Sequence, residues 1–211
     1  MSWLLGDREM SDFRLGVLAS GRGSNLQSIM DACAARQLEA EVVLVISDQV
    51  SAYALERARA AGIPAVYINP GNYQSRQDYD AAVVEILLAH GVELVCLAGY
   101  MRLVGKVMLA AYPNKIINIH PALLPAFPGL HAQRQACEYG VKYSGCTVHI
   151  VDEGMDTGPI ILQAAVPVSD GDDEDSLSAR ILEQEHRLYP EALRLFAEGR
   201  IVVAGRKVSI V

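Results

Sequence analysis

Short apolar runs alternate with amphipathic helical segments along the first half of the chain. The apolar runs are bounded by turn-forming residues and predict buried strands over 15–19, 42–46, 66–68, 94–98 and 116–119. The first segment between them carries apolar residues at the i, i+3, i+4, i+7 spacing of one helix face, at Leu26, Ile29, Met30 and Cys33. Two further helices are expected over 52–61 and 75–90. Strands buried on both faces and separated by helices predict an α/β fold, with a Rossmann-like, doubly wound and mostly parallel sheet.

The second half of the chain begins with a different pattern. The segment PALLPAFPG, residues 121–129, holds three prolines and a glycine and therefore predicts a rigid loop without regular structure. A short helix is expected over 132–139. Two apolar strands, 146–151 and 160–166, then flank the loop DEGMDTGP and are expected to pair antiparallel. The C-terminal half of the sheet is therefore expected to be mixed and partly antiparallel.

The end of the chain predicts one long helix and a hairpin. The helix is expected over 176–198, with a kink at Pro190, and the hairpin over 201–211 around Gly205. Residues 1–12 show no clear period and are interpreted as a flexible leader. The remaining 13–211 should form one domain, since a single domain commonly has about 100–200 residues.

Composition and charge narrow the class of protein. The chain has 211 residues, of which 51% are hydrophobic and 20% are charged, as in ordinary globular proteins. The formal net charge of −7 argues against a nucleic-acid partner, because such proteins present basic surfaces to the phosphates. The apolar runs are much shorter than the roughly 20 residues of a membrane helix, and no secretory signal is visible, so we expect a cytoplasmic protein.

The four cysteines lack the C-x-x-C spacing of metal and redox sites. They lie mostly inside apolar runs, and reduced, buried thiols are expected. We therefore predict neither thiol chemistry nor a metal site.

A glycine-rich turn follows the first strand and precedes the first helix. It comprises Ser20, Gly21, Arg22, Gly23, Ser24 and Asn25. Backbone N–H groups at a glycine turn and a helix N-terminus can hold a phosphate, and Arg22 could add a charge-assisted contact. The Lys-Ser/Thr ending of a Walker A loop is missing, and Leu26 stands at the third glycine of the dinucleotide motif. A monophosphate fits best, although Asp48 after the second strand leaves a ribose-binding dehydrogenase open.

Two further segments carry residues suited to acid–base chemistry. Asn118 and His120 share one face at the carboxyl end of a strand, where an amide donor beside an imidazole suits a developing oxyanion. Asp156 lies in the DEGMDTGP loop and could orient an imidazole and relay protons, or serve only as a solvated turn residue. The sequence alone does not pair Asp156 with His120. His149, on the preceding strand, is expected to be structural or to support the site indirectly.

Four motifs together resemble the phosphoribosylglycinamide formyltransferases, a family of folate-dependent enzymes. They are SGRGSNLQ (20–27), LAGYMRLV (97–104), NIHPALLPAFPG (118–129) and VDEGMDTGPIILQ (151–163). The resemblance extends over about residues 13–200. It implies transfer of a formyl group from 10-formyltetrahydrofolate to the amine of glycinamide ribonucleotide (GAR) in purine biosynthesis. It also implies small-molecule substrates only, no metal, and a monomer or homodimer.

The resemblance assigns roles to individual residues. Asn118, His120 and Asp156 match the catalytic residues of the family. The ribonucleotide phosphate and ribose would be bound by Arg22, Gly23, Ser24, Asn25 and Glu185. The folate would be bound by Arg76, Met101, Arg102, Leu103, Val104, Val151, Asp152, Glu153, Gly154 and Met155. The phosphate-binding half would then span 13–112, and the folate and catalytic half 113–211.

Other functions remain open at this point. A formyltetrahydrofolate hydrolase would use the same Asn, His and Asp with water as the nucleophile, but would have no need of a phosphate turn. A methionyl-tRNA formyltransferase is longer and binds RNA, which the acidic composition opposes. A dehydrogenase or a non-catalytic binding module would explain only the first motif. Leu182 departs from relatives that carry a polar residue there, so details of substrate contact are open.

Overall fold

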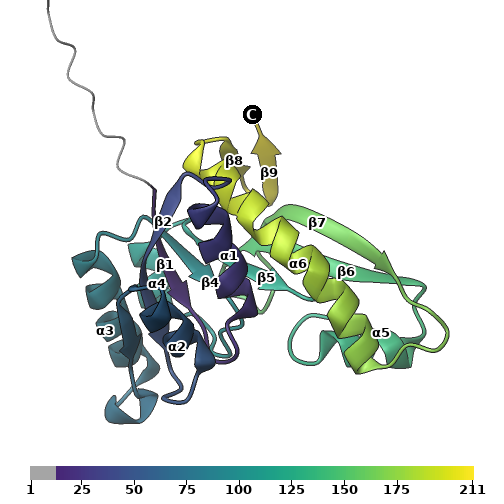
Figure 1. The fold of residues 1–211 in the computed structure, drawn as a ribbon, viewed down its shortest axis with the longest axis horizontal. Helices are drawn as coiled ribbons and strands as arrows, with labels where there is room; N and C mark the ends of the chain where they lie inside the picture. Colours follow the sequence, from purple (N-terminus) through teal and green to yellow (C-terminus); the bar gives the residue numbers. More distant parts are fainter. Residues whose placement is uncertain (1–12) are drawn as a thin grey trace, which may run out of the picture.

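A central seven-stranded sheet organises the protein (Figure 1). The computed structural model describes residues 13–211, so the predicted leader 1–12 lies outside the described residues. The strand order is β3-β2-β1-β4-β5-β6-β7. The first five strands pair parallel, and β6 and β7 pair antiparallel. Their bounds are β1 Phe13–Leu18, β2 Ala40–Ser47, β3 Ala65–Tyr67, β4 Leu94–Leu97, β5 Ile116–His120, β6 Tyr143–Ile150 and β7 Ile160–Pro167. The predicted α/β class and the antiparallel C-terminal half are confirmed.

The helices agree with the predicted ones to within a few residues at each end, with two additions. They are α1 Ser24–Ala34, α2 Tyr53–Ala60, α3 Arg76–Ala89, α4 Lys106–Ala111, α5 Ala132–Tyr139 and α6 Glu174–Ala197, together with a 3-10 turn, η1 Pro70–Asn72. Neither α4 nor η1 was predicted. Helix α6 continues through Pro190, so the proline does not end it. The predicted terminal hairpin is confirmed as β8 Ile201–Ala204 and β9 Lys207–Ile210.

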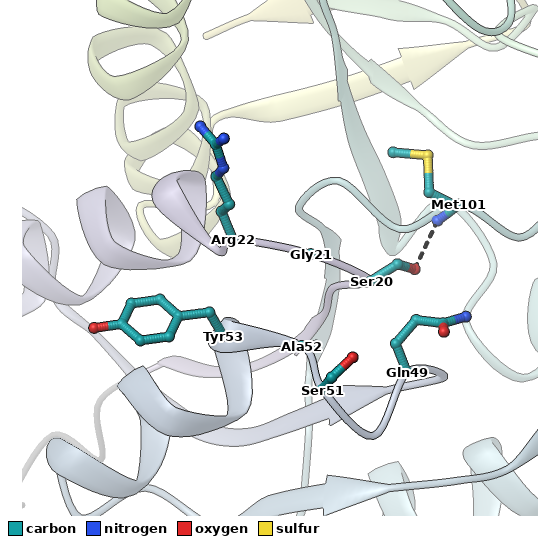
Figure 2. A pocket seen from close by; sticks show the side chains of 8 residues that line it. All are labelled: Ser20, Gly21, Arg22, Gln49, Ser51, Ala52, Tyr53 and Met101. Carbon is teal, nitrogen blue, oxygen red and sulfur yellow. Dashed lines mark hydrogen bonds between the residues drawn. The ribbon is translucent and has the colours of Figure 1, made fainter.

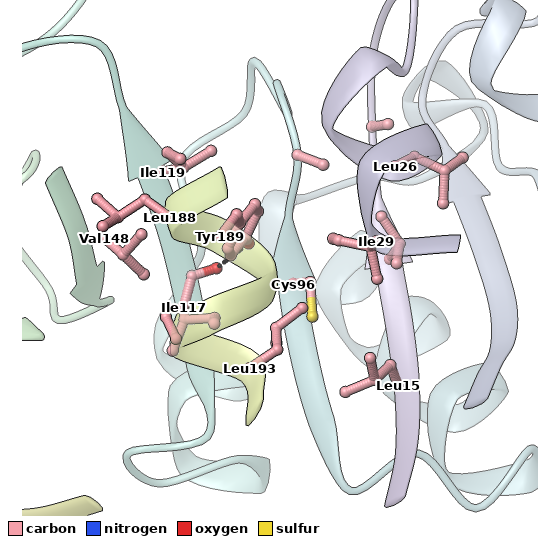
Figure 3. Close-up of a cluster of buried hydrophobic side chains, with 14 of the residues drawn as sticks. Leu15, Leu26, Ile29, Cys96, Ile117, Ile119, Val148, Leu188, Tyr189 and Leu193 are labelled. Carbon is pink, nitrogen blue, oxygen red and sulfur yellow. Dashed lines mark hydrogen bonds between the residues drawn. The ribbon is translucent and has the colours of Figure 1, made fainter. Parts of the chain in front are cut away.

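Two groups of buried side chains pack on the sheet. One includes residues of α1, α2 and α6, and the other includes residues of α3 and α4. Helices α1 and α6, far apart in sequence, lie side by side (Figure 1). Tyr189 of α6 is fully buried against the sheet (Figure 3). Its hydroxyl lies 3.0 Å from the carbonyl oxygen of Leu97 and 3.2 Å from that of Ile117, on neighbouring strands. This contact fixes α6 over β4 and β5.

The direction in which successive strands are added to the sheet reverses between β1 and β4. This reversal places the loop after β1 beside the loop after β4. From β1 the sheet grows through β2 to β3 on one side and from β4 to β5 on the other. Loops at the carboxyl ends of strands diverge at such a point and leave a crevice for ligands. Here the segments after β1 and β4 are joined, because the Ser20 N–H donates to the carbonyl of Gly99 at 3.0 Å.

No helix within 13–211 combines the length and apolar character that crossing a membrane requires.

Candidate active site

A cavity of about 530 Å³ opens along β4, β5 and β6 and contains most of the predicted site. Strand residues Asn118, His120 and His149 line it. Two loops complete the wall, 99–104 after β4 and 151–156 after β6. Asn25 of α1 and Glu185 of α6 also line this cavity. The residues predicted for chemistry and for the ribose therefore share one cavity with all of the predicted folate residues except Arg76.

His120 and Asp156 meet inside this cavity. Nδ1 of His120 lies 3.4 Å from Oδ2 of Asp156, and the two side chains are only 5% and 14% exposed. The other ring nitrogen, Nε2, lies 2.8 Å from the carbonyl oxygen of Phe127. A carbonyl oxygen can only accept a hydrogen bond, so Nε2 must carry a proton to donate one. The neutral ring therefore carries its proton on Nε2. Nδ1, which faces the carboxylate, is the atom that can take up or release a proton.

The protonation of this pair is set by opposing effects. Burial lowers the pKa of His120 below its ordinary value, although the Phe127 carbonyl and the Asp156 charge favour the protonated ring. Burial alone would raise the pKa of Asp156. The hydrogen bond that His149 donates when its ring is protonated, the N–H of Gly129 at 2.8 Å and the charge of a protonated His120 outweigh this effect, so the pKa of Asp156 lies below its ordinary value. At neutral pH the carboxylate is ionised and the imidazole is neutral.

His149 belongs to the same group of side chains, in closer contact than the sequence suggested. Its Nε2 lies 3.6 Å from Oδ1 of Asp156 and 3.3 Å from Nδ2 of Asn118. Its Nδ1 faces the carbonyl of Ile150 at 3.0 Å, so the neutral ring is protonated there and Nε2 accepts from the Asn118 amide. Asn118 keeps its second N–H available for a ligand. Asp156 thus lies between two imidazoles that each have one nitrogen fixed by a backbone carbonyl.

The backbone of the loop before β7 is shaped to present Asp156. The residue adopts a φ of 55°, in the left-handed region that non-glycine residues rarely occupy. The Asp152 carboxylate supports the turn by accepting from the Gly154 N–H at 3.1 Å and the Thr157 hydroxyl at 2.6 Å. Such backbone conformations persist where the surrounding contacts fix them, and they gather at functional sites.

The glycine-rich turn has the geometry expected for a phosphate site. Gly23 precedes the first turn of α1 with a φ of 69°, and a Cβ there would lie 2.8 Å from Cα of Ala54, so only glycine fits. Ser24 begins α1, whose N-terminal N–H groups are free to bind an anion. Arg22 is exposed and lines a second cavity of about 490 Å³ with Gln49, Ser51 and Tyr53 (Figure 2).

Asn25 connects this turn to α6. Its Nδ2 donates to Oε2 of Glu185 at 2.8 Å, and both side chains are buried. Burial raises the pKa of Glu185 above its ordinary value, while the hydrogen bond from Asn25 partly opposes the shift. Oδ1 of Asn25 is buried with no hydrogen-bond partner within the described part of the chain. Leu182, where some relatives carry a polar residue, is half-buried and does not line the main cavity that contains His120.

The predicted folate residues form the mouth of the cavity, with one exception. Met101, Leu103 and Met155 expose apolar side chains there, and Arg102 stacks 4.9 Å from the ring centre of Tyr79. Val104, Val151, Asp152, Glu153 and Gly154 also line the cavity. Arg76 does not. Arg76 begins α3 on the exposed surface, near Gly105, which directly follows the loop 99–104.

Metal ligation has no support among residues 13–211, which hold no group of three or more His, Cys, Asp or Glu side chains placed to bind an ion. Asp48, considered above as a ribose ligand, accepts from the Ser20 hydroxyl at 2.6 Å and from Nε2 of Gln49 at 3.0 Å. Both of its oxygens are therefore engaged within the chain.

Comparison with known proteins identifies the family. The family model described as formyl transferase matches residues 13–193. The chain belongs to the formyl transferase family. The phosphoribosylglycinamide formyltransferase of Bacillus subtilis (strain 168) is 45% identical over 181 residues, which is 86% of this chain and 93% of that protein. The crystal structure of glycinamide ribonucleotide transformylase 1 from Symbiobacterium toebii has 61% identity and a TM-score of 0.94, covering 95% of this chain and 94% of that one.

A longer relative shows the same family domain within a larger protein. The trifunctional purine biosynthetic protein adenosine-3 of Drosophila melanogaster is 49% identical over 193 residues, 90% of this chain. This chain spans 14% of the length of that relative.

Several residues that line the cavity were missed or undervalued at the sequence level. His149 is the main one, and the pairing of Asn118 with His149 across β5 and β6 explains its place. The alternation of apolar and polar residues along β6 indicates the face on which His149 lies. It does not indicate the register of β6 against β5. Tyr100, Leu130 and Gln133 also line the cavity. They lie in loops or on a short helix, where no periodic pattern marks a ligand-facing side.

Proposed function

We propose that this protein transfers the formyl group of 10-formyltetrahydrofolate to the primary amine of GAR, giving formyl-GAR and tetrahydrofolate in purine biosynthesis. The observation that carries the proposal is one cavity lined by Asn118, His120, Asp156, Asn25 and Glu185. It brings acid–base groups and the buried carboxylate of α6 within one enclosure. The activity of the relatives described above supports the same conclusion.

The lining of the cavity suits the two proposed substrates. Apolar side chains at its mouth can cover the flat rings of a folate, as in most small-molecule sites. The turn around Gly23 and Ser24 is suited to the phosphate of the ribonucleotide. Arg22 would add a charge-assisted contact to that phosphate. Glu185 can accept hydrogen bonds from the ribose hydroxyls, since a carboxylate accepts at two oxygens. Arg76, outside the cavity, would meet only the extended glutamate tail.

The chemistry follows from the arrangement of these groups. The amine of GAR attacks the formyl carbon, and the carbonyl electrons move to oxygen, forming a tetrahedral species with an oxyanion. The free N–H of Asn118 stabilises that charge. Nδ1 of His120 takes the proton lost by the attacking amine and returns it to N10 of the folate. The C–N10 bond then breaks, and the oxyanion collapses to the new formamide. Asp156 stabilises the imidazolium while it exists.

Substrate-dependent turnover tests the proposal. Purified protein is incubated with 10-formyltetrahydrofolate, with and without GAR, while tetrahydrofolate and formyl-GAR are both quantified. We expect tetrahydrofolate release that requires GAR and matches formyl-GAR one to one. Equal release without GAR, together with free formate, would instead identify a hydrolase.

We further propose that the protein acts in the cytoplasm on small molecules, as a monomer or homodimer. The two halves of the predicted domain, 13–112 and 113–211, would carry the phosphate site and the folate and catalytic groups.

A further inference from the structure

The cavity-lining segment 99–104 is held at its beginning by a single serine hydroxyl. Oγ of Ser20 accepts a hydrogen bond from the Met101 N–H at 2.9 Å (Figure 2). The Ser20 N–H donates to the carbonyl of Gly99 at 3.0 Å. Ser20 thus contacts the segment twice, once through its backbone and once through its side chain.

The Ser20 hydroxyl is oriented by a buried carboxylate. Oγ donates to Oδ1 of Asp48 at 2.6 Å, and Asp48 is only 5% exposed. Gln49 donates to the other oxygen at 3.0 Å, and no basic side chain within 13–211 forms an ion pair with Asp48. The hydroxyl has a single hydrogen, which it uses in the hydrogen bond to Asp48. Its oxygen lone pairs are therefore left to accept the hydrogen bond from the Met101 N–H. The short, charge-assisted bond fixes that orientation.

The same hydroxyl lies between the two proposed substrate sites. Ser20 directly precedes the turn Gly21–Asn25, which is proposed to hold the phosphate. Met101 lines both the main cavity and the smaller one beside the turn. At its far end the segment is held by a second buried carboxylate, since Oδ2 of Asp80 accepts the Gly105 N–H at 2.8 Å. Between these two points the segment makes the mouth of the folate site.

We propose that Ser20, oriented by Asp48, is a positioning residue that sets the folate-binding segment at its working distance from the phosphate turn. This inference rests on the proposed function, because that function assigns the two substrates to the two segments. Ser20 contacts neither reacting atom. Its contribution is to the place of the Met101 backbone, so folate binding should depend on the hydroxyl more than ribonucleotide binding does.

The test compares Ser20→Ala with Ser20→Thr, which keeps the hydroxyl, and with Ser209→Ala as a control at an exposed serine of β9 that lines neither cavity. We expect Ser20→Ala to raise KM for 10-formyltetrahydrofolate about tenfold, because the Met101 N–H loses its acceptor. KM for GAR should change less than about twofold, and Ser20→Thr and Ser209→Ala should behave like the wild type. Asp48→Asn should raise the folate KM less than Ser20→Ala does, because an amide oxygen still accepts the hydroxyl.

Folate binding measured by calorimetry, with unreactive tetrahydrofolate as the probe, separates this inference from the proposed function. A wild type that makes no formyl-GAR contradicts the proposed function, yet a tenfold weaker Kd in Ser20→Ala alone would still support the inference. Unchanged folate Kd in Ser20→Ala, or no folate binding by the wild type, overturns the inference. So does an equal rise of both KM values together with a lower Tm, which would indicate general destabilisation.

Discussion

Oδ2 of Asp156 lies 3.4 Å from Nδ1 of His120, on the side of the ring opposite the Phe127 carbonyl. The carbonyl keeps a proton on Nε2, so Nδ1 is the atom that gains or loses one. An imidazole that can hold a transient proton at a single, fixed nitrogen suits the transfer of a proton from an amine to a leaving nitrogen. The contact therefore determines which substitutions in this site should affect turnover and which should affect binding.

Replacement of His120 by alanine should lower kcat by about 10²–10⁴, the usual contribution of a group that transfers the proton in the transition state. KM for both substrates should stay near the wild-type value, because the ring acts on the transferring proton and not on the substrate periphery. Steady-state kinetics with both substrates varied checks this. His90→Ala, at the distant end of α3, serves as the matched control. A kcat close to that of the wild type would exclude the proposed role.

Replacement of Asp156 by asparagine should lower the pKa of His120 further. Burial already lowers it, and the Asp156 charge opposes that shift, so removing the charge leaves burial less opposed. Because turnover should also be impaired, the measurement is a titration of the His120 ring by NMR. Glu153→Gln, an exposed acid in the same loop, is the control and should leave the titration unchanged. An equal or higher pKa in Asp156→Asn would contradict the geometry.

Replacement of Glu185 by glutamine should stabilise the ligand-free protein at neutral pH while weakening GAR binding. Burial raises the pKa of Glu185 in the folded state, so between the unfolded and folded pKa values the folded state binds more protons. Stability is therefore lost as pH rises through this window, and the loss is complete above the folded pKa. Glutamine does not ionise, so the variant does not lose stability over this pH range.

Thermal unfolding across pH checks the Glu185 prediction. The variant should have a higher Tm than the wild type at pH 8, and the difference should shrink towards pH 4. KM for GAR should rise because the carboxylate no longer accepts the ribose hydroxyls. A Tm difference that grows on acidification would show that the carboxylate is ionised and stabilising in the folded protein.

Two buried tyrosines should respond oppositely to the loss of a hydroxyl. Tyr189→Phe removes the contacts to the Leu97 and Ile117 carbonyls and should lower the free energy of unfolding by about 1–3 kcal/mol. The Tyr112 hydroxyl is buried with no hydrogen-bond partner within residues 13–211, so Tyr112→Phe should be neutral or stabilising. Urea unfolding of both variants measures the pair. Similar destabilisation in both would show that the hydroxyl contacts of Tyr189 contribute nothing.

Replacement of Arg22 by alanine should chiefly raise KM for GAR, about tenfold or more, through loss of a charge-assisted contact with the phosphate. KM for the folate and kcat should change little. Arg59→Ala, another exposed arginine on the neighbouring helix α2, is the control for the change in net charge. An unchanged KM for GAR would place the phosphate away from Arg22.

The periodic patterns of the sequence predicted most of the fold, and the exceptions have simple causes. Helix α4 has six residues, too few for a helical period to be recognised. The face shared by Asn118 and His120 follows from the period of two along a strand, and the cavity confirms it. The contact of Asp156 with His120 was not predictable, because it requires the loop after β6 to fold back over β5. The place of His149 depended likewise on the register between two antiparallel strands.

The hydrogen bond between Asn25 and Glu185 joins positions separated by 160 residues. A growing polypeptide that has emerged only as far as β7 already contains Asn118, His120 and Asp156, yet it lacks α6, which carries Glu185. The proposed ribonucleotide site is thus the last part of the cavity to be assembled during synthesis. Shortened chains that end before α6 should consequently fail to recognise the ribonucleotide, whatever acid–base groups they retain.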